Sequence, residues 1–496
     1  MLSPAGIAIV VIIVYWSIVE YLKSKGILEK YGISSIGPVL MVRTKRGLDT
    51  LEKLSRPKKF WRIVADAGIP AVFAGMIFMF LLIIAMDVVL FTSPPPPSPV
   101  TEPRNMLLIP WVNTLFPPEY LLLGLIVTLI VHELGHAILC RVEGVRVKAL
   151  GVLLAIVPIG GFAEPDEKEL VENTTRIQRI RIYSAGVISN FIVAIIAFSA
   201  FFYLLNFVSP LVVVVGADNT TELKTGDIIY EINGVKVRTP EDVTDALLKG
   251  DDVIIKADGK VVTLPKIAGV KIVDLYPEYP AAKAGLKKGM IIYRINDTET
   301  PTLYAFKKFM DSTKPGQTLS VFVYNNGSKE VYNVTLAKSP YGDSGFLGVV
   351  IEEYISGVSL GYSEVVLSQL KSLPSKLTTV HGWLTVVAMP LGFKGFGGEA
   401  SKYFEPVILG DGLFYILNTL YWIGWINFYV GLFNCLPAIP LDGGRIFHES
   451  FTALLSRRFG ERGEQMSMKT VRYLAYIVFA SILLSAIIPN ISGFLK

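Results

Sequence analysis

Residues 120–140 read YLLLGLIVTLIVHELGHAILC, an apolar run with a histidine pair inside it. About 20 apolar residues are enough to cross a bilayer as a helix. His132 and His136 stand four residues apart, so on a helix they share one face. Ionisable side chains at membrane depth are costly and mark functional sites. The stretch therefore predicts a membrane helix that carries a chemical site.

The whole composition agrees with a membrane protein. Of the 496 residues, 52% are hydrophobic and 18% are charged, and the mean hydropathy is +0.50. Soluble proteins carry about 25% charged residues, so this composition argues against a wholly soluble chain. A net charge of +5 is too weak to indicate nucleic acid. Two cysteines, Cys140 and Cys435, exclude a disulfide scaffold or a Cys-rich zinc module.

We expect about six transmembrane helices in a polytopic α-helical protein of the cell membrane. The predicted spans are 4–22, 70–92, 120–140, 185–208, 412–436 and 471–489. The segment 23–62 carries eleven Lys and Arg, against one in 93–119, which predicts that 23–62 is cytoplasmic. Both termini and the region 209–352 are then expected outside the cytoplasm.

The region 209–352 contains an internal repeat. LKTGDIIYEING at 223–234 returns as LKKGMIIYRIND at 286–297, an offset of 63 residues. Short β-branched runs between turn residues predict two small β-rich domains inserted between the spans. The repeated pattern, followed each time by a short helical pattern, resembles PDZ domains. PEYPAAKAGL at 277–286 resembles the PDZ stretch in which a Pro-Ala turn precedes a short helix. The alternative is a pair of simple β-rich spacers.

The H-E-x-x-H motif at His132, Glu133 and His136 predicts a zinc site. Both imidazoles can bind one Zn²⁺, which lowers the pKa of a bound water to about 7. The Glu133 carboxylate can then take the water's proton and pass it to a leaving amine. The alternative is a pair of histidines satisfied by helix contacts.

Two histidines leave a catalytic zinc short of a third protein ligand. A candidate is Asp442, which follows the apolar span 412–436 between two prolines and a glycine pair. Irregular backbone at membrane depth is tolerated only where protein or a wet cavity surrounds it. A carboxylate completing a two-His site fits that requirement. From spacing alone, a helix-capping Asp at a turn remains the alternative.

Together these motifs resemble the site-2 protease family of intramembrane zinc metalloproteases. The resemblance rests on H-E-x-x-H in a span and N-x-x-P-x-x-P-L-D-G far downstream. It extends to GVLLAIVPIGGFAEP at 151–165, similar to the family's membrane-associated β-hairpin, and to AGVISNF at 185–191. MPLGF at 389–393 is a looser match. Family members often carry PDZ domains between their second and third core spans.

The resemblance implies a role for each matched residue. His132, His136 and Asp442 are the expected zinc ligands, and Glu133 is the expected catalytic base. Asn190 and Asn434 are expected near the substrate carbonyl, where an amide N–H is a neutral donor for a developing oxyanion. For both asparagines, hydrogen bonding between membrane helices is the alternative.

The predicted organisation combines the spans, the repeat and the resemblance. Its parts are an extra N-terminal pair of spans with a basic cytoplasmic loop (1–100), the first part of the protease membrane core (101–208), two PDZ-like domains (209–265 and 266–352), an interfacial or gating segment (353–411), and the second part of the core (412–496).

The predicted function is a zinc metalloendopeptidase that cleaves transmembrane segments of other proteins. The expected partners are a transmembrane protein substrate, peptide or protein segments at the PDZ-like domains, and membrane lipid, with no nucleic acid. Three alternatives remain. The first is a catalytically inactive, membrane-tethered PDZ scaffold, and the second is an intramembrane metal transporter. The third is another membrane metalloprotease class, with a Glu as its third ligand.

Overall fold

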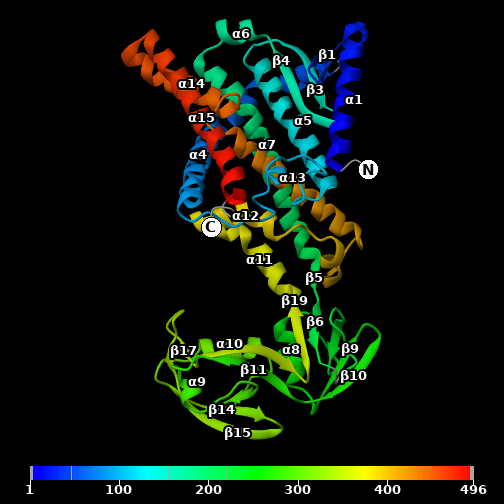
Figure 1. Ribbon diagram of the computed structural model, residues 1–496, viewed down its shortest axis with the longest axis vertical. Coiled ribbons are helices and arrows are strands. Elements are labelled where there is room, and N and C mark those ends of the chain that lie inside the picture. The colour runs from blue at the N-terminus through cyan, green and yellow to red at the C-terminus, as the bar shows by residue number, and fades with distance from the viewer. Residues whose placement is uncertain (1–3, 46, 156, 219–220, 492–496) are drawn as a thin grey trace. The chain divides into compact units, whose positions relative to one another are not determined.

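The computed structural model describes residues 4–45, 47–155, 157–218 and 221–491. Its contacts divide the chain into two compact units. Helices dominate the first, here called the helical unit, and strands dominate the second, the β unit (Figure 1). The helical unit comprises Met1–Tyr203, Ala388–Gly395 and Ile416–Lys496, and the β unit comprises Leu204–Val387 and Phe396–Tyr415.

Long apolar helices make up most of the helical unit. Its described helices are α1 (Pro4–Ser24), α2 (Ile27–Lys30), α3 (Leu48–Ser55), α4 (Lys58–Thr92), α5 (Pro118–Val142), α6 (Glu167–Glu172), α7 (Arg176–Leu204), α13 (Gly412–Asn434), α14 (Asp442–Phe459) and α15 (Glu461–Ile491). Helix α13 begins in the β unit, as does α12 (Val380–Gly392).

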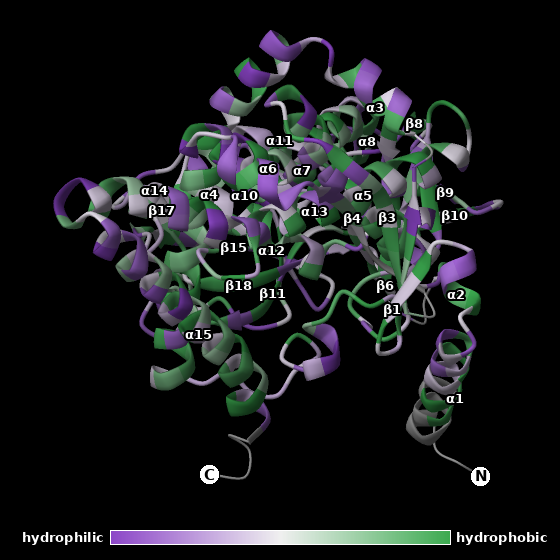
Figure 2. Cartoon of the chain, turned by 90° about the horizontal axis from the view of Figure 1, so that it is seen from above, coloured by the Kyte–Doolittle hydropathy of each residue, from purple (hydrophilic) through white to green (hydrophobic). Residues whose placement is uncertain are grey.

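Five helices in the described part of the chain are long and apolar enough to cross a membrane. They are α4, α5, α7, α13 and α15. Large hydrophobic side chains such as Tyr476 and Phe479 stay exposed on α15, and Figure 2 colours segments of this helix green. Such exposed apolar surface is expected of a helix that faces lipid. The first predicted span, 4–22, forms α1, whose side chains at 4–9, 11 and 12 lie outside the described residues, so the count of six stays a prediction.

Helix α4 packs closely against the helices that follow it in the helical unit, and the assignment of 1–100 as an addition to the family core stays a prediction. A side chain at Gly68 would meet Ile188 Cδ1 at 2.6 Å, and one at Gly75 would meet Cys435 Sγ at 2.8 Å. Small residues let membrane helices approach closely. These two glycines face α7 and the residue that follows α13, so α4 is packed directly against both helices.

A four-stranded antiparallel sheet packs against α5, the helix that carries the histidine pair. Its strands are β1 (Ile33–Ile36), β2 (Val39–Thr44), β3 (Val147–Ala155) and β4 (Val157–Pro165), in the order β1-β2-β3-β4. The last two form the hairpin expected at 151–165. The first two come from the basic segment 23–62, for which the sequence predicted no pairing. Because both hairpins share one sheet, both must lie on the same side of the membrane.

The β unit is built around one continuous sheet. The order is β10-β9-β7-β6-β19-β18-β11-β12-β14-β15, with β8 on β7 and β13 on β12. The elements are β5 (Val208–Pro210), β6 (Val212–Ala217), β7 (Ile228–Ile232), β8 (Val235–Lys236), α8 (Pro240–Leu247), β9 (Asp252–Ala257), β10 (Lys260–Pro265), β11 (Ala268–Leu275), α9 (Pro280–Lys283), β12 (Ile291–Ile295), β13 (Thr298–Glu299), α10 (Leu303–Asp311), β14 (Thr318–Asn325), β15 (Ser328–Thr335), β16 (Ala337–Lys338), β17 (Gly345–Phe346), β18 (Val349–Ile355), β19 (Val358–Tyr362), α11 (Ser363–Lys376) and β20 (Phe404–Pro406).

The internal repeat reappears as a structural repeat with the same offset. Strands β7 and β8 and helix α8 correspond to β12, β13 and α10. Asn233 and Asn296 both take a φ of 51° after the first strand of each copy. Each asparagine side chain accepts a hydrogen bond from the next long strand, from the Ile254 and Ser320 N–H groups respectively. The repeated Asn is therefore a turn residue that ties strand to strand.

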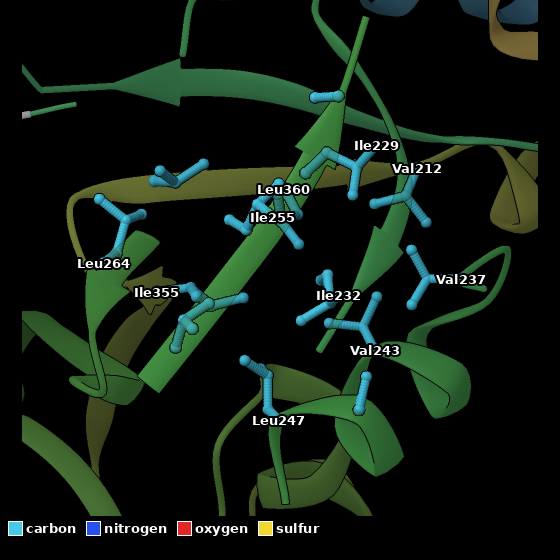
Figure 3. Packing of buried hydrophobic residues seen from close by; sticks show 14 of the residues in the cluster. Val212, Ile229, Ile232, Val237, Val243, Leu247, Ile255, Leu264, Ile355 and Leu360 are labelled. Atoms are coloured by element: carbon cyan, nitrogen blue, oxygen red, sulfur yellow. The ribbon is translucent and has the colours of Figure 1, made fainter. Parts of the chain in front are cut away.

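The two repeats are nested rather than simply consecutive. Strand β19 pairs with β6, and its residues Val358 and Leu360 belong to the buried cluster of the first repeat. Figure 3 shows Leu360 in this cluster together with Ile355, the last residue of β18. The first β-domain is therefore β6–β10 with β19, and the second, β11–β18, is inserted before its last strand. This corrects the predicted boundaries, because 353–362 completes the sheet instead of beginning a gating segment.

Buried polar contacts join the two β-domains. The Glu353 carboxylate accepts hydrogen bonds from Tyr362 Oη at 2.6 Å and from the Leu303 N–H at 2.9 Å. Burial raises the pKa of Glu353, against the opposing effect of these two donors. The hydroxyls of Thr244 on α8 and Thr302 before α10 are 2.6 Å apart. The domains therefore share both a sheet and a polar interface.

Candidate metal centre

Helix α5 places two imidazoles side by side. His132 and His136 lie one turn apart, and their Nε2 atoms are 3.2 Å apart. Only 9% of His132 is exposed. The apolar residues around the motif fold as one uninterrupted helix from Pro118 to Val142, so the i, i+4 spacing brings both rings to one face.

Asp442 reaches the histidines from the other end of the sequence. Helix α13 ends at Asn434, and α14 begins at Asp442 after an irregular turn. Asp442 Oδ2 lies 3.1 Å from Nε2 of each histidine, and the residue is 8% exposed. Gly443 lets the turn close, because a side chain there would collide with the Cys435 carbonyl oxygen. The turn thus brings a carboxylate to the histidine pair.

The geometry of these three donors suits zinc. Tetrahedral zinc with ligand distances of 2.0–2.2 Å separates its ligand atoms by about 3.3–3.6 Å. The three donor atoms of this site are 3.1–3.2 Å apart. Asp442, His132 and His136 all lie within the reach of one ion in the described structure. A set of two imidazoles and one carboxylate leaves the fourth position open for water.

A backbone carbonyl orients His136. Its Nδ1 lies 2.7 Å from the carbonyl oxygen of Ile182 on α7. Since a carbonyl only accepts, Nδ1 carries the hydrogen, so Nε2 is the ring nitrogen that could bind a metal ion. Metal-binding histidines are usually held in this way by an acceptor behind the ring.

Asn190 stands behind His132. Its amide nitrogen is 3.1 Å from His132 Nδ1, and its Oδ1 is buried without a partner in the described structure. The two amide atoms are distinguished only by their hydrogen bonds. With His132 binding a metal through Nε2, Nδ1 carries a hydrogen, and the turned amide would offer Oδ1 as its acceptor. Asn190 therefore contacts His132, and its expected role at the substrate carbonyl stays a prediction.

Asn434 lies at the end of α13, as expected, but bonds within its own helix. Its Nδ2 donates to the Val430 carbonyl at 3.1 Å. The two remaining histidines do not join the cluster: His448 Nδ1 lies 3.0 Å from Ser467 Oγ, and His381 is exposed. Cys140 is a buried free thiol. The role predicted for Asn434 also stays a prediction.

Glu133 is held by the neighbouring hairpin. Its Oε2 accepts a hydrogen bond of 2.9 Å from the Ala163 N–H of β4. A side chain at Gly161 would approach Glu133 Cγ to 3.0 Å, so β4 runs directly beside this carboxylate. The strand therefore fixes the position of the Glu133 carboxylate.

Gly186 is a site residue that the sequence reasoning missed. A side chain at this position on α7 would strike His136 Nε2 and would come within 2.7 Å of His132 Nε2. A glycine in the middle of a helix is unfavourable by about 1 kcal/mol relative to alanine, so its presence has a packing reason here. The signal available in the sequence was its place inside the AGVISNF stretch, four residues before Asn190.

Fold and site together describe a chain with helices long and apolar enough to cross a membrane, and an H-E-x-x-H motif whose two histidines, with Asp442, could hold a metal ion. The chain belongs to peptidase family M50, whose family model matches residues 120–478. This match confirms the resemblance to the site-2 protease family, and family membership makes the chain a metalloprotease.

Two curated relatives match more than two thirds of this chain. An uncharacterized protein of Methanocaldococcus jannaschii is 24% identical over 92% of this chain and 88% of its own. A putative zinc metalloprotease of Clostridium perfringens is 24% identical over 68% of this chain and 88% of its own. Among solved structures, the PDZ domain of the SdrC-like protein from Listeria monocytogenes covers 17% of this chain and 88% of its own, with 22% identity and a TM-score of 0.16.

Proposed function

We propose that this protein is an intramembrane zinc endopeptidase that cleaves transmembrane segments of other membrane proteins. The observation that carries the proposal is the convergence of His132, His136 and Asp442 within 3.1–3.2 Å of one another, with Glu133 on the next position of the same helix. Zinc bound by these residues would make a water nucleophilic at neutral pH and polarise the scissile carbonyl.

The chain's own residues supply the proton transfers. Glu133 takes a proton from the attacking water and delivers it to the nitrogen of the leaving amine, so that the C–N bond breaks with a neutral product. Ile182 and Asn190 hold the two imidazoles in the orientation that directs both Nε2 atoms to the site. We assign Asn434 to substrate contact at the end of α13.

The substrate must reach this site with an extended backbone. A helical amide is shielded by its own hydrogen bonds, and no water replaces them in the bilayer core. Strand β4 is the outermost strand of its sheet and lies beside Glu133, so an unwound segment would meet strand backbone next to the base. The test is cleavage of a reconstituted single-span substrate by wild type and Glu133→Gln, with the cut mapped by mass spectrometry. A cut outside the span would contradict the proposal.

We assign the β-domains to the side of the membrane opposite the four-stranded sheet. One predicted span, α7, separates β4 from β6 in the chain. The basic residues of 23–62 favour the cytoplasm for the sheet, which leaves 209–352 outside.

Cysteine labelling in intact cells checks this topology. Ser328 is exposed on β15, and the two native cysteines are buried, so the background is low. We expect Ser328→Cys to react with a membrane-impermeant maleimide before lysis. The matched variant Lys30→Cys, at an exposed position of the basic segment, should react only after lysis. Labelling in the reverse order would overturn the topology.

The β-domains are assigned as PDZ-like modules that select substrates, either by binding an extended peptide through strand addition or by excluding bulky external domains. None of the four motif residues lies within them. The chain enters these domains after Leu211 and leaves them before Ser363, and these two residues are adjacent. The Leu211 N–H donates a hydrogen bond to Ser363 Oγ at 2.7 Å, and Ser363 Oγ donates one to the Leu211 carbonyl at 2.8 Å.

This adjacency defines a clean deletion, of 212–362 with a two-glycine link. The deletion removes strand β19 together with β6 and β18, the two strands that it pairs with. No strand of this sheet is therefore left without its partners. We expect the deletion variant to keep zinc and cleave a single-span substrate, and to cleave substrates with large and small external domains at more similar rates than the intact protein. The same deletion in Glu133→Gln is the inactive control. An unchanged ratio would reject selection by these domains, and loss of zinc would reject their independence.

A further inference from the structure

The N-terminal hairpin β1–β2 pairs with the hairpin β3–β4 that lies beside Glu133, and it falls outside the family match, which begins at residue 120. We propose that this hairpin holds β4 in place beside Glu133, and that Arg43 is the positioning residue through which it acts. The inference rests on the proposed function, since Glu133 is the base in that reaction.

The first observation is the dependence of Glu133 on β4. The Ala163 N–H is the hydrogen-bond donor to Glu133 Oε2, at 2.9 Å. Gly161 packs against the same side chain two residues earlier. Any displacement of this strand therefore moves or frees the carboxylate.

The second observation is that Arg43 bridges across β3 to β4. Its Nε donates to Glu164 Oε2 at 3.0 Å, and its Nη1 donates to Ser34 Oγ on β1 at 2.6 Å. Its guanidinium carbon lies 5.9 Å from the centre of the Phe162 ring. Arg43 thus contacts the residue on each side of Ala163, the donor to Glu133.

The third observation is the glycine that makes this bridge possible. Gly151 stands opposite both Arg43 and Phe162 in the strand registers. A side chain at Gly151 would collide with the Phe162 ring, so the missing side chain lets that ring lie across β3 toward Arg43.

The physical need for such a brace follows from strand number. An isolated two-stranded hairpin is marginally stable, whereas three or more strands give a sheet stability of its own. Five register pairs, from Leu40↔Leu154 to Thr44↔Leu150, add β2 to the family hairpin. The pairing of β2 stabilises β3, and the ion pair between Arg43 of β2 and Glu164 of β4 links β2 to β4 as well.

The test uses the full-length protein and the variants Arg43→Ala, Arg43→Glu, Glu164→Arg and the double variant Arg43→Glu/Glu164→Arg. Lys45→Ala, at an exposed position two residues along, is the matched control. Three quantities are measured: zinc content, amide hydrogen exchange of the segment 161–165, and kcat and KM for a single-span substrate.

We expect Arg43→Ala to keep its zinc, exchange the 161–165 amides faster and lose at least about fivefold in kcat with little change in KM, because a small misplacement of a catalytic group is enough to cost this much. The charge-swapped double variant should restore slow exchange and most of kcat. Lys45→Ala should match wild type in all three quantities.

Unchanged exchange at 161–165 in Arg43→Ala would overturn the proposal. Faster exchange that the charge swap fails to restore would overturn the Arg43–Glu164 link as its basis. The exchange measurement needs no substrate, so it decides the question even if wild type shows no Glu133-dependent cleavage. That last result would instead reject the proposed function.

Discussion

Glu133→Gln is expected to bind one zinc ion per chain like wild type and to lose at least about 100-fold in kcat, the lower end of what general acid–base catalysis contributes. The amide of Gln can still accept the hydrogen bond from the Ala163 N–H, so the strand contact is kept. It cannot take a proton from water. Metal analysis and cleavage of a single-span substrate check both halves of the expectation.

Two variants on the same helix make the result specific. His132→Ala should lose both zinc and cleavage, because Nε2 of His132 is one of the three converging donors. Glu119→Gln changes an exposed carboxylate in the first turn of α5 and should behave as wild type. If Glu133→Gln lost as much zinc as His132→Ala, Glu133 would be a ligand and its assignment as base would fail. Metal uptake into vesicles by Glu133→Gln without cleavage by wild type would favour the transporter alternative.

Gly186→Ala should lose zinc although it adds only one methyl group. The new Cβ would occupy the space of His136 Nε2 and press on His132 Nε2. We expect at least about a tenfold fall in zinc affinity, the lower end of the effect of disturbing groups that support a metal site. Competition with a zinc-sensitive dye measures the affinity, and the cleavage rate at saturating zinc measures what remains of the site.

Gly392→Ala is the matched control for this variant. A side chain at Gly392 would meet nothing within 4 Å, and the residue is also helical. Alanine is favoured over glycine inside a helix by about 1 kcal/mol, so neither substitution weakens its helix through propensity. A loss of zinc confined to Gly186→Ala would therefore come from the collision with the histidines. Normal zinc affinity in Gly186→Ala would show that the two histidines can shift to make room for a methyl group. Gly186 would then not be required for zinc binding.

Local sequence patterns account for much of what the structure shows. The apolar run 120–140 predicts helix α5 because every backbone hydrogen bond of a helix is made within the segment. The i, i+4 spacing of His132 and His136 determines that the two rings meet. The 63-residue repeat predicts two copies of one β-rich unit, and β7 and β12 start 63 residues apart. The prediction of Asp442 as the third ligand depended on the family resemblance, because its position in the sequence is equally typical of a residue that caps a helix.

What local patterns leave open is pairing over long separations. The sequence of β19, VSLGY, lies within the predicted interfacial segment, and nothing in it indicates that it pairs with β6, more than 100 residues earlier. The basic segment 23–62 predicts a side of the membrane, but not that its hairpin joins β3. Likewise, nothing near Gly68 or Gly75 indicates which helix they face.

The sequence by itself therefore determined the membrane class, the histidine pair with the neighbouring Glu133, and the existence of the repeat, since each depends on residues close together in the chain. Only the tertiary structure decided that Gly186 and Asn190 of α7 contact the histidines, that Ala163 holds Glu133, and that Arg43 braces the strand that does so. These contacts join residues tens to more than a hundred positions apart. Which distant segments meet is decided by the packing of whole helices and strands, and no local spacing encodes it.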